Sequence, residues 1–213
     1  MATARGRRES TGFEFPGGLL CLDFVNTIRR RPAADREEQL REAGDVTSWA
    51  LQAGILRRAE ARRLLRRARR VPSERDLHDA RAVREAIYAV FSAVAAGRRP
   101  DPGALWTLGG AAARAVSRAR LAPGGGRFSW QWDGRPDTLD RIVWSVSASA
   151  VEFLTSGDLT RVRECAAGGC GRLFLDRSRN RTRQWCDMQV CGNRAKARRH
   201  YERLRARRRQ PGG

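Results

Sequence analysis

The sequence has no long hydrophobic run. A membrane-spanning helix needs roughly 20 consecutive apolar residues, whereas the longest candidate, Leu19 to Val25, is short and contains Asp23. Residues 2–10 are charged and lack the apolar segment of a signal peptide. We therefore expect a cytoplasmic protein with no membrane partner.

Lysine and histidine are also scarce. Lys196 is the single lysine, and His78 and His200 are the two histidines. Neither histidine lies in a motif that places it beside a nucleophile, and the chain has neither a phosphate-binding glycine loop nor an H-E-x-x-H motif. The sequence therefore predicts that the protein is not an enzyme.

Arginine is abundant instead. The 213 residues include 43 Lys and Arg against 23 Asp and Glu, a net charge of +20. A charge of this size favours a polyanionic partner, with nucleic acid first and an anionic membrane surface second. More than half of the excess, 16 basic minus 4 acidic residues, lies in residues 161–209. A second run, Arg57 to Arg70, is interpreted as a solvated helix face, with nucleic-acid binding as the alternative.

Four of the five cysteines form two equal pairs. Cys165 and Cys170 are separated by four residues, fifteen residues follow, and Cys186 and Cys191 are again separated by four. Cytoplasmic cysteines at such spacing are typical of a four-thiolate zinc site. We expect one structural Zn²⁺, because four sulfur ligands leave no position for water. Cys21 lies alone in an apolar segment and is expected in the core.

The pattern of apolar residues predicts a mainly α protein with a small β-hairpin. We expect a basic tail over residues 1–12, a helical domain over 13–157, a zinc module over 161–209 and a short tail over 210–213. Gly171 and Gly192, which each follow a cysteine pair, are expected to adopt unusual backbone angles. The expected elements are a strand at Phe13–Phe15, a buried helix in 19–27, a helix at 45–52 capped by Asp45, a helix at 55–70, a helix from Ser73 to Gly97, a helix at 105–119, a hairpin of 120–122 with 127–132, and a helix from Pro136 to Gly157.

The zinc module is expected to be treble-clef-like and to fold on the binding energy of its metal. Residues 172–176 alternate as a strand that pairs with 161–164, and Trp185 can cover the metal. A basic helix with a narrow stripe of Ala197, Tyr201 and Leu204 begins near Cys191. Its candidate base-reading residues are Arg194, Lys196 and Arg198, and its candidate phosphate contacts are Arg199, Arg203 and Arg207. The alternative is a solvated basic helix without a specific target.

These residues resemble a known family. Trp185-Cys186-Asp187-Met188 followed by Cys191-Gly192-Asn193-Arg194 is similar to the CGNR zinc finger. The run from Gly17 to Thr27 resembles the opening of the ABATE domain, which precedes this finger in bacterial proteins described as stress-induced transcription regulators. The resemblance implies DNA binding by the finger and signal sensing or homodimerisation by the helical domain. An RNA- or protein-binding adaptor is the alternative function.

Asp23 and Asn26 are polar residues inside an apolar segment. Buried polar groups need hydrogen-bond partners, so the first interpretation is that both side chains hold a helix end or a neighbouring loop. The functional alternative is that they line a pocket for an effector, whose identity the sequence does not reveal.

Overall fold

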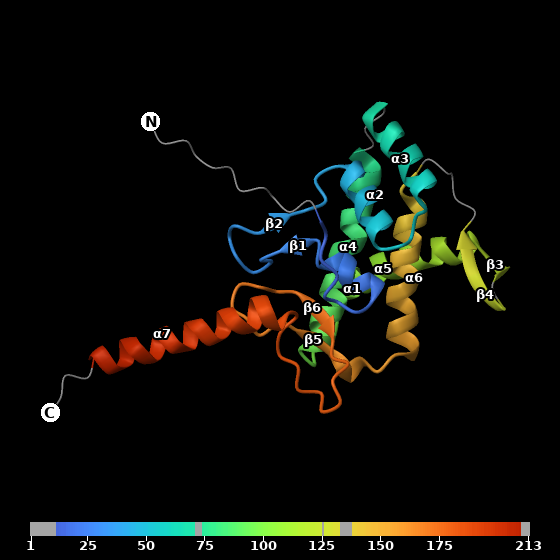
Figure 1. The fold of residues 1–213 in the computed structure, drawn as a ribbon. Helices are drawn as coiled ribbons and strands as arrows, with labels where there is room; N and C mark the ends of the chain where they lie inside the picture. The colour runs from blue at the N-terminus through green and yellow to red at the C-terminus, as the bar shows by residue number, and fades with distance from the viewer. Residues whose placement is uncertain (1–11, 71–73, 125, 133–137, 210–213) are drawn as a thin grey trace, which may run out of the picture.

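The computed structural model describes residues 12–70, 74–124, 126–132 and 138–209. Helices α4 (Glu74–Ala95) and α6 (Asp140–Ser156) run through the middle of the molecule, and both α1 (Leu20–Val25) and α5 (Pro102–Ser117) pack against them (Figure 1). Helices α2 (Ala43–Gln52) and α3 (Arg58–Arg70) form one end, and the cysteine-rich part of the chain forms the opposite end. The predicted fold class is confirmed.

Helix α1 lies at the centre of the hydrophobic core, as the sequence predicts. Leu22 and Phe24 are fully buried, and the Phe24 ring packs against Trp49 of α2 with 4.7 Å between the ring centroids. Cys21 is also fully buried, and this burial raises the pKa of its thiol to about 12. The thiol is therefore a neutral core group, separate from the other four cysteines.

Several predicted helix ends need correction. Helix α2 begins at Ala43, and Asp45 caps it from the third helical position by accepting the backbone N–H groups of Arg41 (2.7 Å) and Glu42 (3.0 Å). Helix α5 begins at Pro102, because the Asp101 carboxylate accepts the backbone N–H of Ala104 at 2.8 Å. Phe13 to Phe15 form no strand in the described chain. The predicted helix starts at Ser73 and Pro136 lie outside the described residues.

Strands β3 (Ala119–Gly124) and β4 (Arg127–Trp132) form the predicted hairpin, in which Leu121 is paired with Trp130. A second two-stranded ribbon of β1 (Ile28–Arg29) and β2 (Glu37–Glu38) was not predicted, because each strand has only two residues. Among the described residues no helix is both long and apolar enough to cross a membrane.

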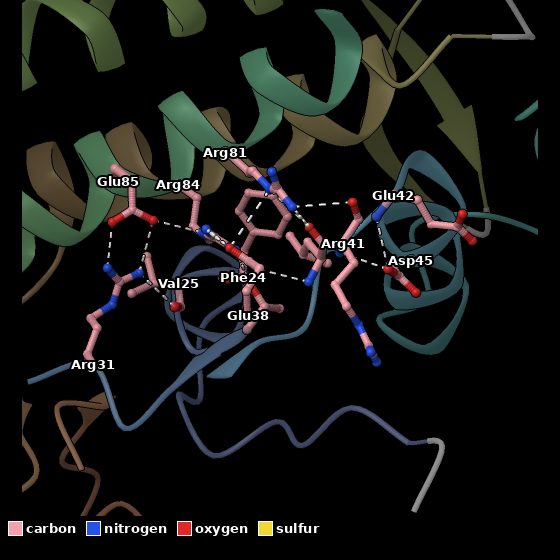
Figure 2. A network of polar contacts seen from close by, with 12 residues as sticks. Phe24, Val25, Arg31, Glu38, Arg41, Glu42, Asp45, Arg81, Arg84 and Glu85 are labelled. Carbon is pink, nitrogen blue, oxygen red and sulfur yellow. Dashed lines mark hydrogen bonds and ion pairs between the residues drawn. The ribbon is translucent and has the colours of Figure 1, made fainter. Parts of the chain in front are cut away.

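A polar network fastens the β1–β2 ribbon to α4 (Figure 2). The Arg84 side chain is only 2% exposed and donates to both carboxylate oxygens of Glu38, at 2.7 and 2.6 Å. It also bonds Glu85, which in turn accepts from Arg31 at 2.5 Å. Although burial opposes ionisation, these two arginines hold the pKa of Glu85 below its usual value. The bidentate contact between Arg84 and Glu38 ties together residues 46 positions apart.

The cysteine-rich module shares the core of the helical domain. Strands β5 (Val162–Glu164) and β6 (Leu173–Leu175) pair antiparallel as predicted. Val162 and Leu173 are fully buried in the main hydrophobic core, whereas Phe174 faces the cysteines. One face of this hairpin therefore packs on the apolar surface of α1 and α4. That the module folds on the binding energy of its metal stays a prediction.

Candidate metal centre

Two separate turns bring the four predicted cysteines together. Cys165 and Cys170 lie on the loop that joins β5 to β6, where the Cys165 N–H bonds the carbonyl of Arg172 at 2.9 Å. Cys186 lies just before the short π-helix Met188–Gly192, and Cys191 is part of that helix. The π-helix continues directly into α7 (Asn193–Arg209). A backbone hydrogen bond of 2.9 Å from Ala166 to the carbonyl of Gln184 holds the two turns side by side.

The glycines of these turns serve different purposes. Gly171 has φ +66°, which an L side chain rarely adopts, so the prediction of an unusual backbone angle is confirmed there. It is wrong for Gly192, which is part of the π-helix and is absent from the positive-φ glycines of the described chain. A Cβ at Gly192 would lie 2.6 Å from the Met188 sulfur, so any other residue there would displace the flexible, exposed Met188 side chain.

The sulfur positions fit a tetrahedral metal. The four Sγ atoms all lie within 4.8 Å of one another. The Cys170–Cys186, Cys186–Cys191 and Cys191–Cys170 separations are 3.7, 3.6 and 3.6 Å. Zinc–sulfur bonds of about 2.3 Å at tetrahedral angles place the sulfurs about 3.8 Å apart. The geometry therefore matches one Zn²⁺ bound by four thiolates, without rearrangement of the backbone.

The electrostatics of the cluster also call for a cation. Hydrogen bonds from the neighbouring Cys170 and Cys186 thiols, helped by the backbone N–H of Cys186, lower the pKa of Cys165. The resulting thiolate then raises the pKa of Cys170 and of Cys186. Without a metal the cluster therefore favours one thiolate and protonated neighbours. A dication allows all four to ionise, because it replaces their mutual repulsion by attraction.

The centre is closed. The four cysteine residues are 1–8% exposed and pack with Phe174 and Trp185, so the prediction that Trp185 covers the site is confirmed. Arg183 lies over the Phe174 ring at 4.6 Å and donates to the carbonyl of Trp185 at 2.9 Å and to that of Cys186. With four sulfur ligands and no open side, the site has the features of a structural zinc centre rather than a catalytic one.

Asp176 is a supporting residue whose role the sequence did not reveal. It is fully buried, and its two carboxylate oxygens accept the backbone N–H groups of Ser178 (2.8 Å) and Arg183 (3.0 Å). Although burial opposes ionisation, these hydrogen bonds lower the pKa of Asp176. The carboxylate thus fixes the conformation of the loop that precedes Cys186 and so positions this cysteine. The short pattern Asp-x-Ser was the available signal, since Asp side chains often bond the backbone two residues ahead.

Asp23 and Asn26 connect α1 to the module. The Asn26 amide donates to the carbonyl of Leu173 at 2.8 Å and accepts its N–H at 3.0 Å, so it occupies the free edge of β6. Asp23 accepts the N–H of Gly17 at 2.7 Å, and the Gly17 carbonyl accepts the N–H of Leu175 at 2.8 Å. These contacts explain both residues structurally. That they line an effector pocket stays a prediction.

Helix α7 leaves the body of the protein beyond its first turn and extends away from the other helices (Figure 1). Arg194, Lys196, Arg199 and Arg203 are exposed along it, and the guanidinium of Arg199 lies 6.0 Å from the centre of the Trp185 ring. Arg198 is also exposed but bonds Glu202 at 2.8 Å. The side chain of Arg207 lies outside the described residues. The interpretation of these residues as nucleic-acid contacts stays a prediction.

Family models agree with this division of the chain. A model named ABATE, described as "Putative stress-induced transcription regulator", matches residues 18–157. The chain belongs to the ABATE family. A model of the CGNR zinc finger matches residues 161–204 of this ABATE protein, and that range contains all four zinc-binding cysteines. The comparison with curated proteins found no match. The ABATE protein is therefore a zinc-binding protein of regulatory type.

Proposed function

We propose that this ABATE protein is a bacterial transcription regulator that binds DNA through α7, with the zinc centre as its rigid base. The observation that carries the proposal is the position of α7: its first turn continues from the segment that holds Cys191, and the rest projects free of the body (Figure 1). Fixing one end of a helix to a metal centre holds its direction and so reduces the entropy lost on binding.

The dimensions and charge of α7 support a nucleic-acid partner. The helix has nine Lys or Arg residues and one Glu among 17 residues. At 1.5 Å per residue it is about 26 Å long, and a helix about 10–12 Å wide fits the major groove of B-DNA, which is about 12 Å wide. Its one acidic side chain, Glu202, is paired with Arg198, so it offers little repulsion to phosphate.

The contacts within α7 support different proposed roles for its arginines. Lys196, Arg199 and Arg203 line one shallow groove on the helix surface together with Glu202. Three basic side chains against one carboxylate suit this groove to contact phosphates. Arg194 lies in the first turn and is exposed, while the Asp176 and Asp187 carboxylates accept hydrogen bonds from Ser178, Arg183 and Val190. Arg194 is therefore the first candidate for base reading, and Arg198 is a weaker one because Glu202 holds it.

The helical domain supplies signal sensing in this proposal. A hollow of about 840 Å³ lies between α2, α3 and α4, and its lining includes Arg41, Ser48, His78 and Arg81. Its size is within the usual range for small-molecule sites, and its mixed charges suit a polar ligand. The proposal assigns the protein no catalytic activity, because four thiolates fill the zinc coordination sphere. It also places the protein in the cytoplasm, where bacterial DNA is found.

The test measures binding of the zinc-loaded protein to fluorescent duplex DNA over a range of salt concentrations. Each phosphate contact contributes about −0.9 to the slope of log K against log salt. Arg203→Ala should therefore reduce the magnitude of this slope by about one and weaken all sequences alike. The matched control is Arg62→Ala, which removes an exposed arginine from α3.

Two outcomes would contradict the proposal. If Arg62→Ala changes the slope and Arg203→Ala does not, α3 is the binding surface. If structured RNA or heparin competes far better than duplex DNA, the adaptor function is correct instead.

Selection of bound sequences from random duplexes tests base reading. Arg194→Ala should cost about 1–3 kcal/mol on the preferred site and remove the preference at one position.

A further inference from the structure

Large apolar side chains are exposed mainly on α5 and the β3–β4 hairpin. Of the eleven large hydrophobic residues exposed in the described chain, six lie between residues 105 and 130. They are Leu105, Trp106, Val116, Leu121, Phe128 and Trp130, and Trp106 is 85% exposed. Large exposed apolar patches on soluble proteins mark interaction sites.

Helix α5 has two apolar faces, and only one of them is covered. Ala104, Leu108, Ala111 and Ala115 are buried against α4 and α6. The outward face has Leu105, Trp106, Gly109, Gly110 and Ala113, which line a shallow surface hollow whose walls are almost entirely apolar, and Val116 continues the same helical stripe. In a chain of net charge +20, the residues of this stripe are uncharged, and the nearest charge is the Arg114 guanidinium at its edge, beside Gly110.

No contact within one chain requires glycine at the two glycine positions in the centre of the stripe. Gly109 and Gly110 lie inside a regular helix, where glycine costs up to about 1 kcal/mol relative to alanine. A Cβ at Gly109 would meet nothing within 4 Å, and one at Gly110 would meet only the Arg114 guanidinium at 3.7 Å. The protein's own packing therefore does not require them. Small residues at such positions allow a second helix to approach closely.

The hairpin that follows α5 also has one apolar face. Leu121 pairs with Trp130 and Pro123 pairs with Phe128, so these four side chains share a face of the two-stranded sheet. Leu121, Phe128 and Trp130 are 57%, 71% and 61% exposed. Two-stranded sheets are marginal without a packing partner. The hairpin follows α5 closely, because only Arg118 separates the end of α5 at Ser117 from the start of β3 at Ala119.

We propose that α5 and the β3–β4 hairpin form the interface of a two-fold homodimer, with α5 packed antiparallel on α5 of a second copy at Gly109 and Gly110. Trp106 and Val116 are each about 7.5 Å along the axis from residue 111 at 1.5 Å per residue. A two-fold axis at the level of residue 111 places Trp106 of each copy at the level of Val116 of the other, and Gly109 at the level of Ala113, so small residues lie at the crossing. The stripe is thus complementary to itself, as a two-fold interface requires.

Area and charge both favour a second copy as the occupant. A fully exposed aromatic side chain offers about 150–250 Å², so the six exposed side chains together offer on the order of 800 Å². Stable interfaces bury about 800 Å² on each partner. Two copies of charge +20 repel one another, and an uncharged stripe is where such copies approach at the lowest electrostatic cost. Dimerisation does not depend on the proposed DNA binding.

The test is sedimentation of the full-length, zinc-loaded protein over a concentration series. We expect a species of twice the 23.9 kDa chain mass. The dimer should not weaken between about 0.15 and 0.5 M NaCl, because salt screens the repulsion between copies. Gly109→Gln places a side chain at the crossing, and Trp106→Gln removes the largest contact. Each should raise the dissociation constant at least about tenfold, or more than about 1.4 kcal/mol.

The control is Thr107→Gln, which places the same residue on the exposed but polar side of α5. It should leave the dissociation constant unchanged within about twofold, because the side chain at position 107 points away from the apolar stripe and lies outside the proposed contact. Circular dichroism should show native helix content in all three variants, since positions 106, 107 and 109 are exposed. A wild-type protein that is monomeric at about 100 μM overturns the proposal. A dimer that survives both Gly109→Gln and Trp106→Gln also overturns it.

Discussion

The link between α1 and the zinc module offers the sharpest test of the structure. Asn26→Ala removes both hydrogen bonds between the Asn26 amide and the backbone of Leu173. Asn26 is 3% exposed and Leu173 is fully buried, so water does not readily replace the amide. Leaving a buried donor or acceptor unsatisfied costs about 1–3 kcal/mol each. With one N–H and one C=O affected, we expect a loss of about 2–6 kcal/mol.

The assay is urea unfolding of the zinc-loaded protein, followed by circular dichroism and by zinc release to a coloured chelator. Because Val162 and Leu173 belong to the main core, both signals should move together to lower urea in Asn26→Ala. The matched control is Asn180→Ala, which removes the same amide from an exposed loop and should change stability by less than about 0.5 kcal/mol.

Two results would refute this reasoning. If Asn26→Ala costs less than about 0.5 kcal/mol, the amide does not support β6, contrary to the cost expected for unsatisfied buried groups. If zinc release shifts while the helical signal stays in place, the module and the helical domain unfold separately. The shared core described above would then not make them one cooperative unit.

Three further predictions concern the metal, the buried ion pair and a buried carboxyl. Cys170→Ser should reduce bound zinc from about one equivalent to nearly none by elemental analysis, and one retained equivalent would exclude the four-thiolate site. Glu38→Ala removes one of the two carboxylates that bond the buried Arg84, while Glu85 remains, and should cost about 1–3 kcal/mol in thermal unfolding. Glu37→Ala on the same strand should cost under about 1 kcal/mol, and equal losses would argue against the Arg84–Glu38 pair. Burial raises the pKa of Asp23 from 3.8 to about 6, so the folded protein holds the carboxyl proton more tightly than the unfolded chain does. The protein therefore loses stability as the pH rises from about 4 to 6 and this proton is released. Asp23→Asn should therefore be more stable than wild type at pH 7.5, by up to about 3 kcal/mol, and this advantage should shrink toward pH 5; a pH-independent difference would contradict it.

The metal site and the hairpins were predictable because their signals are local. Two cysteine pairs at equal spacing can reach one tetrahedral ion whatever the rest of the fold does, and the four sulfurs indeed gather within 4.8 Å. The alternation of residues 127–132 after a glycine-rich turn likewise determined the β3–β4 hairpin. The basic character of α7 was also evident, since it depends on composition and helical spacing alone.

The connections between distant segments were decided by the tertiary structure. Asn26 and Leu173 are 147 residues apart, and Arg84 and Glu38 are 46 apart, so no periodicity relates them. The sequence showed only that Asn26 lies in an apolar segment, and its partner depends on where β6 docks. The two-residue strands β1 and β2 are held by the same long-range contacts, which explains why local propensity did not predict them.

Helix α5 shows most clearly what the sequence could not determine. Its sequence is apolar on both sides, with Ala104 and Leu108 on one and Leu105 and Trp106 on the other. Hydrophobic periodicity predicts the helix but does not choose between two apolar faces. The choice is made by α4 and α6, which fit closely against the alanine-rich face and leave Trp106 exposed. The sequence alone determined the zinc ligands and the helices, whereas packing decided which surfaces remain available for a partner, because burial depends on the shape of every neighbouring element.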